Sequence, residues 1–156
     1  TTKLPSFVPT EDQRRRQKMS VEADRAALEQ TLSDWAEASN QGGDTGADGF
    51  AAFVTEDGVM LPPNQKRADG QAAIRGWALG LTSAQSFNIS WKTGRAYVTA
   101  GSKLAYAVGV FELSLKDGAG NLVTDRGKFL DAFERQAEGT WLCTVGSGNS
   151  DHPAGG

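Results

Sequence analysis

The residue pattern with the clearest chemical potential is a carboxyl group set between two aromatic rings. Residues 129–133 read Phe-Leu-Asp-Ala-Phe, and the side chains of a β-strand alternate between its two faces. Phe129, Asp131 and Phe133 therefore share one face of the expected strand. If this face lines an apolar pocket, Asp131 is an acid or base with a raised pKa, because burial disfavours the charged carboxylate. The alternative is an Asp131 that faces solvent or accepts a hydrogen bond from a neighbouring strand or an arginine.

Other residue types that commonly do chemistry are scarce. His152 is the single histidine and lies in a Gly-rich tail after the last expected strand, so a histidine base is not expected unless the tail folds over the site. Cys143 is the single cysteine, has no basic neighbour in the sequence and is expected to be a small buried hydrophobic residue. One histidine and one cysteine, without HxH or CxxC spacing, cannot provide a usual set of metal ligands. We predict neither a metal nor a cofactor.

Composition and charge exclude several classes of partner. The chain has 156 residues, 38% of them hydrophobic and 22% charged, which is enough for one domain with a core. A net charge of -3 has the wrong sign for a surface that neutralises phosphates, so no nucleic acid is expected. The longest apolar runs, at residues 50–54 and 104–108, are far below the roughly 20 residues of a membrane span. The sequence is compatible both with a cytoplasmic protein and with an exported protein whose signal peptide has been removed.

The N-terminal third has the periodicity of helices. Residues 1–9 contain two prolines and no periodicity, which predicts an extended arm. Thr10 and Gln13 have the spacing of a capping box, so a helix is expected to begin there. The apolar stripe of this helix consists of Leu28, Leu32, Trp35, Ala36 and Ser39. A glycine-rich linker is predicted at residues 42–46, and two further helices at 47–54 and 71–81.

The rest of the chain has the pattern of strands. A short strand is predicted at residues 59–61, after a turn at 56–58 and before Pro62-Pro63. Long strands are predicted at 86–99, 103–116, 122–136 and 140–146, joined by short glycine-bearing links that are typical of antiparallel hairpins. The expected architecture is α+β, with helices on the concave face of a curved, mainly antiparallel sheet. A single domain would span residues 10–153, followed by a tail at 154–156.

Several short motifs, in order, resemble the nuclear transport factor 2-like superfamily. The first half contributes Leu-Ser-Asp-Trp at 32–35, Asn-Gln-Gly-Gly-Asp at 40–44, Phe-Val-Thr-Glu-Asp-Gly-Val at 53–59 and Gly-Gln-Ala-Ala-Ile-Arg at 70–75. The second half has Asp-Arg-Gly-Lys-Phe at 125–129, Phe-Glu-Arg-Gln at 133–136, Gly-Thr-Trp at 139–141 and Asn-Ser-Asp at 149–151. This half is similar to the SnoaL-like branch of bacterial proteins related to ketosteroid isomerase. The resemblance covers about residues 21–153.

The resemblance implies a cone-shaped fold with an apolar pocket at its open end. In that alignment Asp131 falls where ketosteroid isomerase keeps a protonated aspartic acid that donates a hydrogen bond to the developing oxyanion. Trp35 falls at the position of the oxyanion tyrosine, and Leu61 at the position of the catalytic base. A standard ketosteroid isomerase is therefore not expected, because leucine cannot accept a proton.

The remaining pocket candidates come from strand parity and from the aromatic residues. Phe111 shares a face with the small residues Ala107 and Gly109, and Thr144 is expected to share one with Leu142, Gly146 and Gly148. Met60, Trp77 and Trp91 are further wall candidates, with an ordinary core position as the alternative. Asn149 would lie near the mouth and offer a donor and an acceptor, or else close a turn.

Three classes of function remain open. One is a cofactor-independent isomerase, lyase or cyclase that uses Asp131 as its acid or base. Another is a binder of a small apolar metabolite without turnover. The third is a dimerisation module, because Tyr106, Val108 and Val110 form an apolar outer face on their strand. With that face exposed, a homodimer through the outside of the sheet is expected.

Overall fold

The computed structural model describes residues 8–99 and 101–153. Its helices are α1 (Glu11–Ser39), α2 (Gly43–Ala52) and α3 (Gln71–Thr82), and its strands are β1 (Val54–Leu61), β2 (Ala68–Asp69), β3 (Asn88–Val98), β4 (Leu104–Lys116), β5 (Leu122–Arg135) and β6 (Trp141–Ser150). Val8 and Pro9 have no regular structure. The rest of the expected arm, residues 1–7, and the expected tail, residues 154–156, lie outside the described residues.

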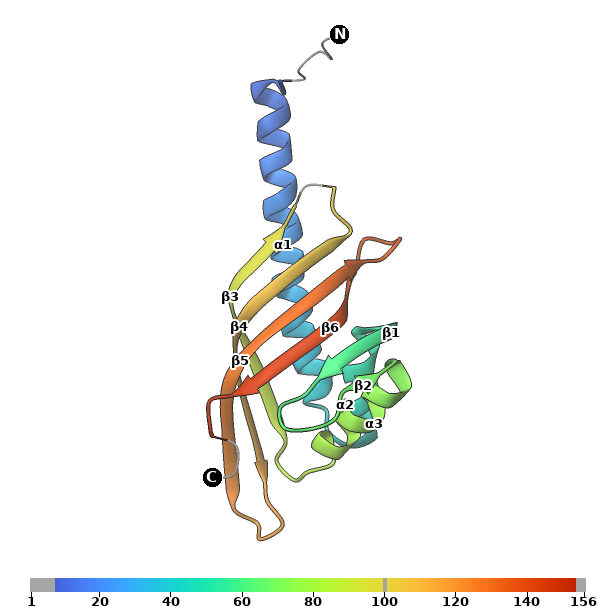
Figure 1. Ribbon diagram of the computed structural model, residues 1–156, viewed down its shortest axis with the longest axis vertical. Coiled ribbons are helices and arrows are strands. Elements are labelled where there is room, and N and C mark those ends of the chain that lie inside the picture. The colour runs from blue at the N-terminus through green and yellow to red at the C-terminus, as the bar shows by residue number, and fades with distance from the viewer. Residues whose placement is uncertain (1–7, 100, 154–156) are drawn as a thin grey trace.

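The strands form one open, mixed sheet in the order β2-β1-β6-β5-β4-β3. Strands β3 to β6 pair antiparallel in hairpin order, which confirms the predicted meander, and β1 pairs with β6 in parallel. The long helix α1 runs across the sheet, and α2 and α3 lie together beside β1 (Figure 1). The α+β fold class expected from the sequence is confirmed.

Helix α1 begins at the predicted capping box. The Gln13 N–H donates to Thr10 Oγ1 at 3.2 Å, and the Thr10 N–H donates to Gln13 Oε1 at 2.8 Å, so two otherwise unpaired N–H groups are satisfied. The predicted stripe faces the core, with Leu28, Leu32, Trp35 and Ser39 buried. By contrast, every residue from 11 to 20 is exposed, and this part of the helix extends beyond the sheet (Figure 1).

The glycine-rich run after α1 is not a linker, and that prediction is wrong. Helix α2 begins at Gly43, four residues before the expected start at 47. The reason is close packing, because a Cβ atom on Gly46 would overlap the Ser39 carbonyl oxygen and one on Gly49 would lie 2.6 Å from that of Ala38. Glycine thus allows the backbones of α1 and α2 to approach closely, which outweighs its low helix propensity.

Two strands are longer than predicted and contain irregularities. Strand β1 begins at Val54, and residues 56–58 form no turn but lie inside it, where its pairing with β6 shifts. In β6, Phe133 pairs with Cys143 and Ala132 with Val145, so Thr144 is an extra, bulged residue. The bulge shifts by one residue the alternation of β6 side chains between the two faces of the sheet. The expectation that Leu142 and Thr144 share a face with Gly146 is therefore wrong.

The core lies between the concave face of the sheet and the helices. Its largest fully buried side chains include Trp35, Trp141, Phe133, Leu28 and Ile74. Around Trp35 the aromatic rings form a cluster, with the Phe50 centroid at 4.9 Å and the Trp91 centroid at 5.1 Å. In the described part of the chain, no helix combines the length and the apolar character that a membrane crossing requires.

Candidate functional site

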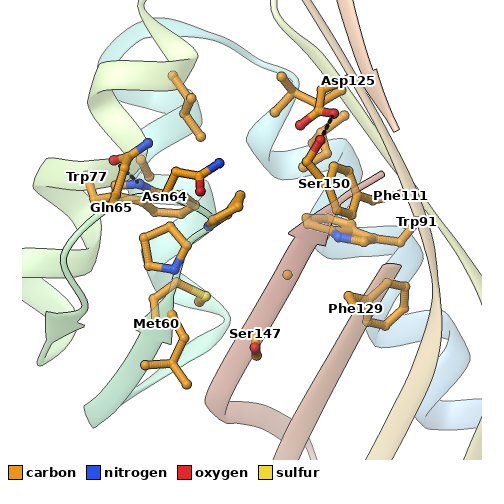
Figure 2. A pocket seen from close by; sticks show the side chains of 18 of the residues that line it. Met60, Asn64, Gln65, Trp77, Trp91, Phe111, Asp125, Phe129, Ser147 and Ser150 are labelled. Carbon is orange, nitrogen blue, oxygen red and sulfur yellow. Dashed lines mark hydrogen bonds between the residues drawn. The ribbon is translucent and has the colours of Figure 1, made fainter. Parts of the chain in front are cut away.

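A cavity of about 490 Å³ opens between the sheet and the helical layer. One wall comes from the sheet, including Phe111 of β4 and Phe129 of β5, and the other from Trp77 of α3 and the loop at residues 62–65. Figure 2 shows these two walls facing each other across the open space. Its lining residues come from α1, α2 and α3, from strands β1, β3, β4, β5 and β6, and from the loops beside them. The site is therefore a pocket between the two layers.

Most of the residues predicted for the pocket line this one cavity. They are Trp35, Met60, Trp77, Trp91, Phe111, Phe129 and Asp131. Their positions make the pocket largely aromatic, as Trp91 and Phe111 are cross-strand partners and Phe129 is on the next strand along the sheet. A pocket of this kind suits a flat or chain-like apolar molecule.

Three predicted residues are not among those that line the cavity. Phe133 is fully buried below it and meets Trp35 edge to face, with ring centroids 6.5 Å apart. Thr144 is the bulged residue of β6 and is half-buried. Asn149 is exposed, and its side chain lies on the opposite face of β6 from its neighbours Gly148 and Ser150, which line the pocket.

Asp131 lies on the pocket floor and is 5% exposed. It pairs with Ala107 of β4 on one side and Gly146 of β6 on the other, so only small residues flank it on the sheet. Its Oδ1 accepts one hydrogen bond, from the Ser147 N–H at 3.3 Å. Among the ion pairs of the described residues, none involves Asp131.

Burial dominates the electrostatics of Asp131. Removal from water raises the pKa of this carboxyl to about 7, and the hydrogen bond from the Ser147 N–H lowers it only in part. The geometry explains the direction, since one long hydrogen bond is a weak replacement for the hydration of a carboxylate. At neutral pH, both the neutral acid and the carboxylate are therefore populated.

Glycines on the sheet allow the aromatic rings to lie against it. Gly127 pairs with Phe111, and Gly109 pairs with Phe129. A Cβ atom on Gly127 would lie 2.6 Å from the Phe111 ring, and one on Gly109 would lie 2.8 Å from the Phe129 ring. Each ring thus occupies the space above the glycine of its partner strand. This arrangement keeps the volume above the sheet open.

The side chain of Trp35 already uses its only hydrogen-bond donor. Its indole N–H donates to the Phe50 carbonyl oxygen at 2.9 Å, and the residue is 1% exposed. In the resemblance to ketosteroid isomerase, this residue takes the place of the oxyanion tyrosine, but here its donor serves the core. Leu61, at the place of the catalytic base, lines the cavity and is 39% exposed.

Cys143 pairs with Phe133 of β5 and is fully buried. Burial raises the pKa of its thiol, and the nearby charge of Asp131 raises it further. A thiol in this state is a weak nucleophile, because the reactive form is the thiolate. Within residues 8–99 and 101–153, no three His, Cys, Asp or Glu residues gather closely enough to hold a metal ion.

Sequence reasoning missed a polar cluster at the pocket mouth, formed by Asp125, Ser150 and His152, which all line the cavity. The expectation that His152 lies away from the site is wrong, since its Nε2 is 3.9 Å from Asp125 Oδ1. One signal was available, because Asp125 has the same parity on β5 as Asp131. Ser150 was missed because the predicted last strand stopped at residue 146.

Comparisons with known proteins identify the fold. Neither the scan against protein-family models nor the search of curated proteins gave a match. Among solved structures, a ketosteroid isomerase-like protein from Erwinia carotovora atroseptica matches with a TM-score of 0.71 and 18% identity over 83% of this chain and 98% of that one.

Two other solved structures support the same conclusion. An NTF2-like protein with a cystatin-like fold from Novosphingobium aromaticivorans gives a TM-score of 0.66 at 17% identity, covering 95% of each chain. A candidate dehydratase from the NTF2-like family of Streptomyces avermitilis gives 0.67 at 12% identity, covering 85% of this chain and 99% of that one. At such identities the likeness concerns architecture alone. The chain has the nuclear transport factor 2-like fold, and ketosteroid isomerase-like proteins are among its structural neighbours.

Proposed function

We propose that the chain is a small-molecule enzyme, a cofactor-independent isomerase, lyase or cyclase that transfers a proton through Asp131. The observation that carries this proposal is a carboxyl group on the floor of an aromatic pocket, with a pKa raised to about 7 by burial. A group that titrates near neutral pH is suited to both giving and taking a proton. The ligand is a largely apolar molecule with a carbonyl or similar oxygen.

The chemistry follows from the two protonation states of Asp131. As a carboxylate, it removes a proton from a carbon next to the ligand carbonyl, and the electron pair moves onto the carbonyl oxygen. The Asp131 acid then returns that proton to the same carbon, which restores the ligand, or to another carbon, which isomerises it. If instead a leaving group on the following carbon departs and takes the proton from Asp131, the result is elimination. With Leu61 at the place of the isomerase base, Asp131 would do both steps alone.

Proton exchange tests this proposal without knowledge of the natural substrate. In D2O, NMR follows the loss of the protons next to the carbonyl of 2-undecanone, an apolar ketone. We expect the wild type to accelerate this exchange and Asp131→Asn to reduce it to the uncatalysed rate, because the amide cannot accept the proton. Asp151→Asn is the matched control, since it removes a carboxylate from outside the set of residues that line the pocket.

A second candidate is a binder of an apolar metabolite without turnover. It is favoured by the use of the Trp35 N–H inside the core, so that this indole offers no donor to a ligand oxygen. The same experiment separates the candidates. If 2-undecanone quenches the tryptophan fluorescence but exchanges no faster with the wild type than with Asp131→Asn, the enzyme proposal is wrong and the binder replaces it.

We also propose that the chain forms a homodimer through the outer face of the sheet. The support is an apolar group on that face: Val108 is 37% exposed, Val110 51% and Leu130 51%. Beside them, Tyr97 and Tyr106 stack with ring centroids 5.2 Å apart. The pocket opens on the opposite face, so dimerisation and ligand binding are compatible. The remaining alternative, a dimerisation module without a ligand, predicts that no apolar ketone binds.

A further inference from the structure

The polar cluster at the pocket mouth is ordered by its own hydrogen bonds. Ser150 Oγ donates to Asp125 Oδ1 at 2.6 Å and accepts from the His152 N–H at 3.0 Å. Figure 2 shows Asp125 and Ser150 joined at one end of the pocket, above Phe111 and Trp91. These contacts hold the Asp125 carboxyl in one orientation at the rim of the cavity.

One oxygen of the Asp125 carboxyl group, Oδ2, is available to a ligand. The side chains of Ser150 and His152 both approach Oδ1 of Asp125. Among the described residues, no donor lies within hydrogen-bond distance of Oδ2. The side chain of Asp125 is 34% exposed, so it is neither buried in the core nor free in solvent. An acceptor at the rim of an apolar cavity is a ready partner for a donor on a ligand.

Asp125 and Asp131 lie at two ends of one wall. They are six residues apart on the same face of β5, which corresponds to at most about 20 Å at 3.3 Å per residue. Between them on this face are Gly127 and Phe129, and the ring of Phe111 covers Gly127. The wall between the two carboxyl groups is therefore aromatic, and one cavity includes both ends.

We propose that the ligand of this pocket is an elongated, mainly apolar molecule with its carbonyl group at the end that lies against Asp131 and a hydroxyl group at the end bound by Asp125. The inference rests on the proposed function, in that the pocket must bind a small molecule. It adds the substrate class, because a ligand that reaches only Asp131 would leave the ordered acceptor at the mouth unused. The hydroxyl group donates to Asp125 Oδ2, while Ser150 keeps Oδ1 in place.

Two ketones of equal chain length provide the test. They are 2-undecanone, which has no donor, and 11-hydroxy-2-undecanone, which carries a hydroxyl group at the far end. Binding to the whole protein is measured through the fluorescence of the pocket tryptophans and through ligand-observed NMR. The quantity compared is the ratio of the two affinities, which cancels effects that a variant has on the shared ketone.

The variants are Asp125→Ala and the matched control Asp151→Ala. Asp151 directly follows β6 and forms an ion pair with Lys128 at 2.7 Å, but it is not among the residues that line the cavity. We expect Asp125→Ala to reduce the preference for the hydroxylated ketone about tenfold, the value of one hydrogen bond to a carboxylate. The affinity for 2-undecanone should change less than twofold, and Asp151→Ala should keep the preference of the wild type.

Each other outcome has a definite meaning. If Asp125→Ala keeps the preference, or if Asp151→Ala loses it equally, the hydroxyl group is not bound by Asp125 and the inference is wrong. In that case the cluster is only a cap for the end of β6, and the proposed function stands. If neither ketone binds to the wild type, pocket binding itself fails, and the proposed function and this inference are overturned together.

Discussion

Asp131 of β5 lies directly opposite Gly146 of β6, and the missing side chain at Gly146 is what leaves room for the carboxyl group. A Cβ atom at residue 146 would lie 3.3 Å from Asp131 Oδ1 and would overlap the Met60 sulfur. Asp131 on the pocket floor and Met60 on its wall thus both lie against Gly146.

We expect Gly146→Ala to destabilise the protein by about 1 kcal/mol at most, because the atoms nearest to the added methyl group are the end of the flexible Met60 side chain, which can shift. It should also weaken ligand binding, since Met60 must move into the cavity. Urea unfolding and binding of 2-undecanone measure the two effects. Gly118→Ala, at a turn residue with nothing within 4 Å of the added atom, is the control. An unchanged midpoint and affinity in Gly146→Ala would contradict the packing described.

The raised pKa of Asp131 predicts a specific pH dependence of stability. The folded carboxyl holds its proton up to a pH of about 7, whereas the unfolded one loses it near 3.9. Between these values the folded state binds more protons, so stability falls as the pH rises. The loss approaches about 4 kcal/mol above pH 7, at 1.36 kcal/mol per unit of pKa.

Asp131→Asn should remove that dependence. We expect the variant to fold, to match the wild type near pH 4 and to exceed its free energy of unfolding at pH 8, because an amide carries no charge to desolvate. The difference between the two proteins, measured by urea unfolding from pH 4 to 8.5, isolates this group from all others. A constant difference over that range would show that Asp131 has an ordinary pKa.

Trp35→Phe is expected to affect stability but not proton transfer. The substitution leaves the Phe50 carbonyl oxygen without its donor inside the core, which costs about 1–3 kcal/mol, and the lost ring area adds to that. Deuterium exchange into 2-undecanone, followed under conditions where the variant is folded, should keep a rate within about threefold of the wild type. A much larger loss would mean that the indole N–H serves the ligand instead of the core.

The proposed homodimer is tested by its mass in solution and by two matched substitutions. Light scattering at tens of micromolar should return twice the 16.5 kDa of one chain. Val108→Glu places a charge in the centre of the apolar outer face and should give the monomer, because a buried unpaired carboxylate is costly. The control is Ser114→Glu on the same strand, farther along and half-buried. A wild type of 16.5 kDa would contradict the proposal.

Alternation along β5 was sufficient to predict the pocket floor, because a regular antiparallel strand in the middle of a sheet leaves no freedom of register. Asp131 and Phe129 therefore lie where the sequence places them. The position of Thr144 depends on a bulge in β6, and a bulge results from pairing with β1 and β5, which no local pattern reveals. Ser150 was missed because β6 continues four residues beyond the predicted end.

The helix start at Gly43 was missed for a related reason. Glycine is a poor helix former by itself, and only the close contact with the backbone at Ala38 and Ser39 explains it. His152 was misplaced because the path of a glycine-rich tail after a strand is set by tertiary contacts, here the hydrogen bond from its N–H to Ser150.

The uneven support of α1 has a consequence for its amide protons. The helix is anchored to the sheet from Asp24 onward. There Arg135 binds the Asp24 carboxylate, and its guanidinium carbon lies 4.7 Å from the centroid of the Trp141 ring. Before that point residues 11–20 touch no core, so only the capping box and local pairs oppose fraying. Deuterium should therefore enter the first turns within seconds and the segment after Leu28 only on global unfolding, a gradient of protection along a single unbroken helix.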